Sequence, residues 1–143
     1  MADLEHRFDA ITEEYYDRLL DSLRAYAQDE MPRGPVSVEI GSNKGQFLRG
    51  LATEHPDTTY IGLEIRRKYA EMAQASLEQL KVSNARVLRA DAALAFPILF
   101  DAEQVHEIFL LYPDPWWKKR HHKRRVIRPE MLDLFAEKMP SGA

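Results

Sequence analysis

The chain alternates short apolar segments that predict β-strands with segments whose apolar residues recur at helical spacing. The predicted strands are residues 36–41 (VSVEIG), 58–64 (TTYIGLE), 85–91 (ARVLRAD) and 105–112 (VHEIFLLY). Such alternation predicts an α/β fold with an open, mainly parallel sheet, right-handed crossovers and helices on both faces. Ligands of these sheets bind outside the carboxyl ends of the strands, so the residues that follow each strand are the candidate site residues.

Helical spacing predicts four helices, and a fifth segment is ambiguous. In residues 92–100 (AALAFPILF), Pro97 interrupts what could be a helical turn. The apolar positions that define the four helices are Phe8, Ile11, Tyr15, Leu19, Leu23 and Tyr26; Phe47, Leu48, Leu51 and Ala52; Tyr69, Met72, Ala73, Leu77 and Leu80; and, after a helix start at Pro129, Met131, Leu132 and Phe135 facing inward.

Length and composition restrict the class of protein. At 143 residues the chain is at most one domain with a modest core. It contains no cysteine, so neither disulfides nor thiolate metal sites are available. Its start lacks the pattern of a signal peptide, and no apolar run approaches membrane-spanning length. We therefore expect a cytoplasmic protein that does not enter a membrane.

The charge is unevenly distributed. The net charge is -3, yet residues 118–128 hold seven Lys or Arg and no acid, which leaves 13 basic against 23 acidic residues elsewhere. A basic cluster inside an acidic protein favours a local site for a polyanion. An arbitrary basic segment is more often a solvated face, so the position of this one in the fold has to decide.

The loop after the first predicted strand has the pattern Gly41-x-Asn43-x-Gly45. It differs from the G-x-G-x-x-G motif of dinucleotide sites because Asn43 and Gln46 occupy the second and third glycine positions, which disfavours nicotinamide and flavin cofactors. Glu64 closes the second strand, where an acid can accept both hydroxyls of a ribose. A tight turn and a surface glutamate are the plainer interpretations of each feature alone. Together they favour a nucleoside site.

Further acids fall at the same predicted edge. Asp91 ends the third strand, Asp114 follows the fourth, and Glu39 lies near the end of the first strand in an apolar run, where an unpaired charge is costly to bury. Carboxylates can indicate a metal. One carboxylate per strand with ribose spacing is more typical of nucleoside recognition than of a magnesium site.

Residues 112–125 (YPDPWWKKRHHKRR) predict a second substrate site. Pro113 and Pro115 favour extended conformations for the residues before them, which presents Asp114 outside any helix. Trp116 and Trp117 offer surfaces on which bases can stack. The basic residues that follow can neutralise phosphates, so the segment favours an RNA partner.

Four segments together resemble the bacterial tRNA (guanine-N7)-methyltransferases: VEIGSNKGQF, IGLEIRRKY, LRADA and LLYPDPWWKKRHHKRR. Members of that family use S-adenosylmethionine to methylate a guanine in the variable loop of tRNA. The resemblance implies a Rossmann-like class I methyltransferase fold. It divides the chain into an N-terminal helical segment, residues 1–33, and the N-terminal part of a methyltransferase domain, residues 34–143.

The resemblance also implies roles for residues. Asp114 would be catalytic as well as cofactor-binding. Asn43 stands where many members have glycine, and Trp117 where histidine is frequent. The implied cofactor residues are Glu39, Gly41, Asn43, Gly45, Glu64, Asp91 and Asp114, and the implied substrate or RNA residues are Lys118, Arg120, His121, His122, Lys123, Arg124 and Arg125.

The segment KMPSGA at the end predicts a turn toward a fifth strand. We expect the fold to stop before that strand, with the fourth strand at an open edge. Family members continue with segments that contact the guanine. A dimer through the fourth strand is one arrangement that would cover the edge.

Three functions stay open from the residues alone. The first is methylation of guanine at N7; because N7 has a free lone pair, Asp114 would orient the base rather than deprotonate it. The second is methylation of an exocyclic amine; such an enzyme would place its aromatic residue directly after two prolines, whereas Asp114 separates the prolines here. The third possibility is a non-catalytic RNA-binding module. No metal is expected.

Overall fold

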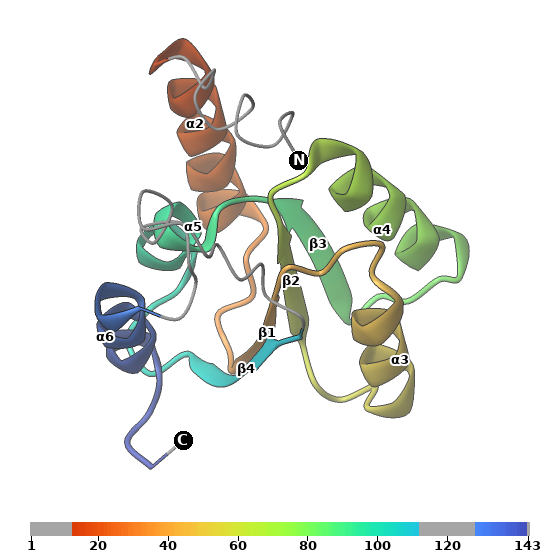
Figure 1. Ribbon diagram of the computed structural model, residues 1–143. Helices are drawn as coiled ribbons and strands as arrows, with labels where there is room; N and C mark the ends of the chain where they lie inside the picture. The colour runs from red at the N-terminus through yellow and green to blue at the C-terminus, as the bar shows by residue number, and fades with distance from the viewer. Residues whose placement is uncertain (1–12, 112–127, 143) are drawn as a thin grey trace.

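The computed structural model describes residues 13–111 and 128–142 (Figure 1). Along the chain the elements are α2 (Glu13–Asp29), β1 (Val36–Ile40), α3 (Gln46–Glu54), β2 (Tyr60–Glu64), α4 (Arg67–Gln79), β3 (Ala85–Arg89), α5 (Ala92–Leu99), β4 (Val105–Leu110) and α6 (Pro129–Lys138). Each predicted strand is present, shortened by one or two residues at its ends.

Within the described residues the sheet has four parallel strands in the order β3-β2-β1-β4. In this register Glu39 of β1 lies between Gly62 of β2 and Phe109 of β4. β1 and β2 are central and completely buried, which is why their sequences are mostly apolar, with one acid each near the carboxyl end and Ser37 as a further polar residue of β1. The predicted open, parallel α/β architecture is confirmed.

Helices cover both faces of the sheet, as predicted: α2, α5 and α6 on one side and α3 and α4 on the other (Figure 1). Successive side chains of a strand point to opposite faces. Val36, Val38 and Ile40 of β1 therefore enter the core under α5, while Ser37 and Glu39 point to the face of α3 and α4. Leu23 of α2 belongs to the first core, and this helix packs mainly against α5.

Two details of the helix predictions are wrong. Leu132 is 51% exposed, and Met72 and Leu80 are 43% and 57% exposed, although we expected all three on apolar faces. The buried stripe of α4 is Ala70, Ala73 and Leu77, because small side chains let this helix approach the sheet closely. The ambiguous segment is helix α5, which continues through exposed Pro97 in its last turn.

Burial accounts for the helix at Pro97. A proline inside a helix removes one hydrogen bond and disturbs the preceding turn. Asp91 offsets part of this cost as N-cap, since its Oδ1 accepts the N–H of Ala93 at 2.8 Å. Phe96 and Leu99 on either side of the proline are buried, and the Phe96 ring packs edge-on against Phe100.

Candidate functional site

The loop between β1 and α3 passes over the carboxyl end of β2. Gly41, Asn43 and Gly45 all have positive φ, of 77°, 56° and 81°. A Cβ on Gly45 would lie 2.8 Å from the Cβ of Ala73 in α4, so the loop can pack there only with glycine. A Cβ on Gly41 would meet nothing within 4 Å, which leaves open space beside that residue. The predicted turn is thus present, and its two glycines serve different purposes.

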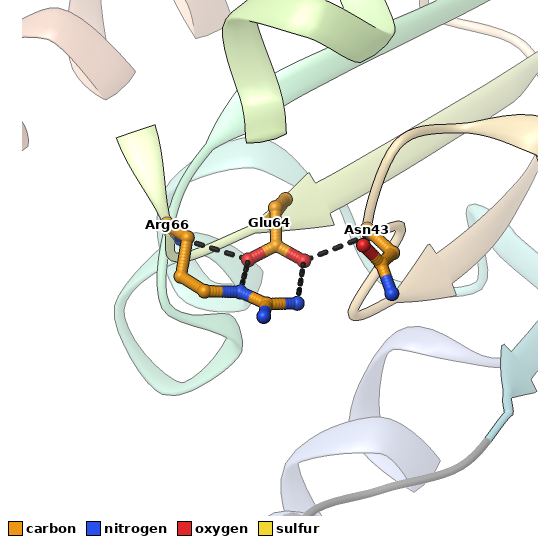
Figure 2. A network of polar contacts seen from close by, with 3 residues as sticks. All are labelled: Asn43, Glu64 and Arg66. Atoms are coloured by element: carbon orange, nitrogen blue, oxygen red, sulfur yellow. Dashed lines mark hydrogen bonds and ion pairs between the residues drawn. The ribbon is translucent and has the colours of Figure 1, made fainter. Parts of the chain in front are cut away.

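Glu64, the last residue of β2, lies beneath this loop and is 2% exposed. Its Oε1 accepts the backbone N–H of Asn43 at 2.8 Å, and its Oε2 accepts the backbone N–H of Arg66 at 2.8 Å. The Arg66 side chain adds Nε–H to Oε2 at 3.2 Å and Nη2–H to Oε1 at 3.5 Å (Figure 2). The buried carboxylate is therefore anchored to the loop on one side and covered by a guanidinium on the other.

Gly62 makes this close approach of loop and strand possible. A Cβ at Gly62 would lie 2.3 Å from the Oγ of Ser42 and 2.9 Å from Cδ2 of Leu48. A side chain at this position would therefore force the buried Ser42 and Leu48 side chains to move, which would disturb the packing of the loop on β2. Ser42, a residue that the sequence analysis did not select, is 4% exposed and donates to the carbonyl oxygen of Glu39 at 3.4 Å.

Glu39 is buried with one carboxyl oxygen, Oε1, left open. It is 2% exposed, and its Oε1 has no hydrogen-bond partner among the residues that the structure describes. Burial raises the pKa of this carboxyl to about 7, with the Ser42 hydroxyl opposing the rise and nearby Glu64 adding to it. We expected a cationic or hydrogen-bonding partner for Glu39: within the described residues the Ser42 hydroxyl acts on the carboxyl, but no ion pair forms and Oε1 stays open. A buried acceptor at a strand end beside an open glycine turn suits a cationic ligand group.

Asp91 reaches the same edge, since β3 runs parallel to β2 and ends at Arg89. Its Oδ1 caps α5, and Oδ2 is the oxygen that takes no part in this cap. The structure therefore brings together six of the predicted residues: Glu39, Gly41, Asn43, Gly45, Glu64 and Asp91. Asp114, Lys118 and the residues from Arg120 to Arg125 lie outside the described ranges.

Arg66 was not predicted to take part. Its position two residues after Glu64 could have indicated the contact, because in an extended segment the side chains of residues i and i+2 point to the same face. Its Cζ also lies 4.1 Å from the centre of the Tyr69 ring, within cation–π distance. A cavity of about 630 Å³ lies elsewhere, between α2, α4 and β3, and none of the six predicted residues lines it. The candidate site is therefore identified by the position of its carboxylates and not by this cavity.

The described residues offer neither a metal site nor a membrane span. Across residues 13–111 and 128–142, no three His, Asp or Glu side chains are grouped so that they could hold a metal ion. In the same ranges, no helix has both the length and the apolar character needed to cross a membrane.

Comparison with known proteins decides the family. Residues 33–143 match the model of a family described as "Putative methyltransferase". The chain belongs to this methyltransferase family. Among curated proteins, the tRNA (guanine-N(7)-)-methyltransferase of Aquifex aeolicus is 40% identical over 107 residues, 75% of this chain and 36% of that protein. The protein of the same name from Synechococcus sp. (strain JA-2-3B'a(2-13)) is 38% identical over 109 residues, 76% of this chain and 46% of that protein.

The resemblance read from the sequence motifs is thereby confirmed, and the chain spans less than half the length of these two methyltransferases. A solved structure of a SAM-dependent methyltransferase from Aquifex aeolicus superposes with a TM-score of 0.56 at 13% identity, over 86% of this chain and 57% of that one. At this identity the likeness concerns the fold alone. It confirms the Rossmann-like methyltransferase fold.

Proposed function

We propose that this chain binds S-adenosylmethionine at the carboxyl ends of β1, β2 and β3 and acts in the methylation of guanine N7 in tRNA. The observation that carries the cofactor assignment is Glu64, buried at the end of β2 and tied to the glycine loop by the N–H of Asn43. That arrangement fits a carboxylate that receives a ribose. The names of the curated relatives support the reaction and the tRNA substrate.

The chain's own residues fit the cofactor at both ends. The uncompensated Oε1 of Glu39 is a ready acceptor for the α-ammonium group of the methionine moiety, and the open space at Gly41 lies at the same strand end. Asp91 is the third candidate contact, through the oxygen that does not cap α5. When bound, the cofactor supplies an electrophilic methyl group on a sulfonium.

The remaining residues of the proposal lie in residues 112–125. Asp114 accepts hydrogen bonds from the N–H groups of the guanine and so turns N7 toward the methyl group. It acts by orientation, since N7 needs no deprotonation. Lys118 and the residues from Arg120 to Arg125 neutralise RNA phosphates. Because tRNA modification takes place where tRNA is found, the proposal puts the protein in the cytoplasm. The division at residue 33 and a dimer through the β4 edge stay predictions.

Calorimetric titration with S-adenosylhomocysteine tests the cofactor site. We expect wild-type protein to bind and Glu64→Ala to lose binding by at least about tenfold, because one deleted charged acceptor leaves two ribose hydroxyls unpaired. Glu54→Ala is the control, since Glu54 is an exposed acid at the end of α3. A folded wild-type protein that does not bind would contradict the proposal.

Mass spectrometry of nucleosides from treated tRNA tests the reaction. N7-methylguanine is expected, and its loss in Asp114→Asn with both substrates still bound would support the role of Asp114. A methyl group on an exocyclic amine would favour that other class of methyltransferase. Binding of tRNA without binding of cofactor would favour an RNA-binding module.

A further inference from the structure

Arg66 fills the side of Glu64 that faces away from the loop. Two backbone N–H groups, of Asn43 and Arg66, each donate to one carboxylate oxygen at 2.8 Å. The guanidinium then donates Nε–H to one oxygen and Nη2–H to the other, at 3.2 and 3.5 Å (Figure 2). Each oxygen accepts two hydrogen bonds in this way, so the acceptor capacity of the carboxylate is used up within the chain.

The guanidinium edge and a ribose have the same donor pattern. A guanidinium presents two parallel N–H donors that match the two oxygens of a carboxylate. The cis-diol of a ribose presents two neighbouring O–H donors, which an acid at the end of the second strand receives in this architecture. Each Glu64 oxygen can accept one hydrogen bond from a backbone N–H and one more. The guanidinium and the ribose diol would both use this second acceptor position on each oxygen. The two donors therefore exclude each other.

We propose that Arg66 is an internal substitute for the ribose diol: it occupies the ribose position on Glu64 in the free protein, and the cofactor binds by displacing its guanidinium. The proposal rests on the proposed function, since it takes Glu64 as the ribose acceptor. It makes Arg66 a residue that sets cofactor affinity through competition.

The difference in burial between the two side chains explains why Glu64 needs a donor in the free protein and why the Arg66 guanidinium can be displaced. The Glu64 side chain is 3% exposed, and a buried carboxylate with too few donors is costly. The Arg66 side chain is 36% exposed, so water can solvate the guanidinium once it moves. Its contacts to Glu64 are longer than the backbone ones. The Tyr69 ring, 4.1 Å from Cζ, supports the docked position.

Titration of Arg66→Ala with S-adenosylhomocysteine tests the competition. The variant keeps both backbone hydrogen bonds to Glu64, so the carboxylate stays in place. We expect it to bind about two- to fivefold more tightly than wild type, the range for a partly exposed ion pair. The ligand-free variant should also unfold at a lower temperature. Arg67→Ala is the matched control: Arg67 is exposed, pairs with Glu71 on its own helix, and should leave the affinity unchanged.

A second measurement does not depend on a substitution. In wild-type protein, the Nε–H proton of Arg66 should exchange slowly with water by NMR, and saturating S-adenosylhomocysteine should remove that protection. Equal or weaker binding by folded Arg66→Ala, or protection that survives saturation, would overturn the competition while leaving the cofactor assignment intact. If wild-type protein binds no S-adenosylhomocysteine, the proposed function fails and the role of Arg66 fails with it.

Discussion

Two buried glutamates on the same face of the sheet differ in how their charge is compensated. Glu64 receives backbone and guanidinium donors on both oxygens, whereas Oε1 of Glu39 receives none from the described residues. Burial favours the neutral form of Glu39 and outweighs the opposing hydrogen bond of the Ser42 hydroxyl, which is why its pKa rises to about 7. Near neutral pH this residue can therefore take either state, and a bound ammonium group would favour the ionised one.

This pKa predicts how stability changes with pH. The pKa of Glu39 is about 7 in the folded protein against an ordinary 4.5, so the folded state binds the proton more tightly. Stability from the neutral group is fully present below about pH 4.5 and is lost as the pH rises through about 7. Glu39→Gln removes the titration, so the variant should lose less stability than wild type between pH 5 and pH 8, by on the order of 2 kcal/mol.

Urea unfolding at the two pH values measures the effect of Glu39. The exposed Glu54 gives the matched variant, Glu54→Gln, which should follow wild type. A Glu39→Gln protein with the same pH dependence as wild type would show that Glu39 is already ionised, and hence paired, in the free protein.

Among the elements, the β1–α3 loop makes a close contact with α4 at Gly45. Gly45→Ala would combine a left-handed backbone at φ 81° with a Cβ 2.8 Å from that of Ala73. We expect it to lower the free energy of unfolding by about 2–4 kcal/mol, the sum of backbone strain and overpacking.

Gly50→Ala is the control for the Gly45 substitution. Gly50 lies inside α3 with open space around its Cα, so alanine there should raise stability by about 0.5–1 kcal/mol through helix propensity. Denaturant unfolding of the two variants compares them directly. If both change stability by the same small amount, the loop does not pack on α4 as described.

For the molecule as a whole, the charge distribution predicts where the proposed RNA partner would bind. Residues 118–128 carry seven Lys or Arg, while 13 basic and 23 acidic residues occupy the rest of the chain. The acidic remainder repels a polyanion, so binding should depend on this one segment and weaken steeply with salt.

Measurement of tRNA affinity against salt concentration tests this prediction. Replacing Arg124 and Arg125 by Ala should weaken binding and make the slope of log K against log salt shallower by about 1–2, as two phosphate contacts are lost. Arg24→Ala removes a basic residue on α2 that pairs with Asp21, and should leave the slope unchanged. An unchanged slope in the double variant would place the RNA elsewhere.

The strand–helix alternation alone predicted each of the four described strands and their parallel direction, because the apolar period and the glycine turns are local properties of the chain. It also predicted Glu39, Glu64 and Asp91 at one edge, since parallel strands share their carboxyl ends. The errors at Met72, Leu80 and Leu132 have one cause. An apolar residue fits a helical period whether or not a partner surface exists at that angle, and only packing decides which positions are covered.

What the sequence determined by itself was therefore the fold class, the family motifs and the edge where the acids gather. Tertiary structure alone decided their surroundings. It brought Asn43 over Glu64 across 21 positions of sequence, left Oε1 of Glu39 without a donor among the described residues, and placed the guanidinium of Arg66 against both oxygens of Glu64. The physical reason is that burial and hydrogen bonding depend on distances between segments, which local periodicity does not encode.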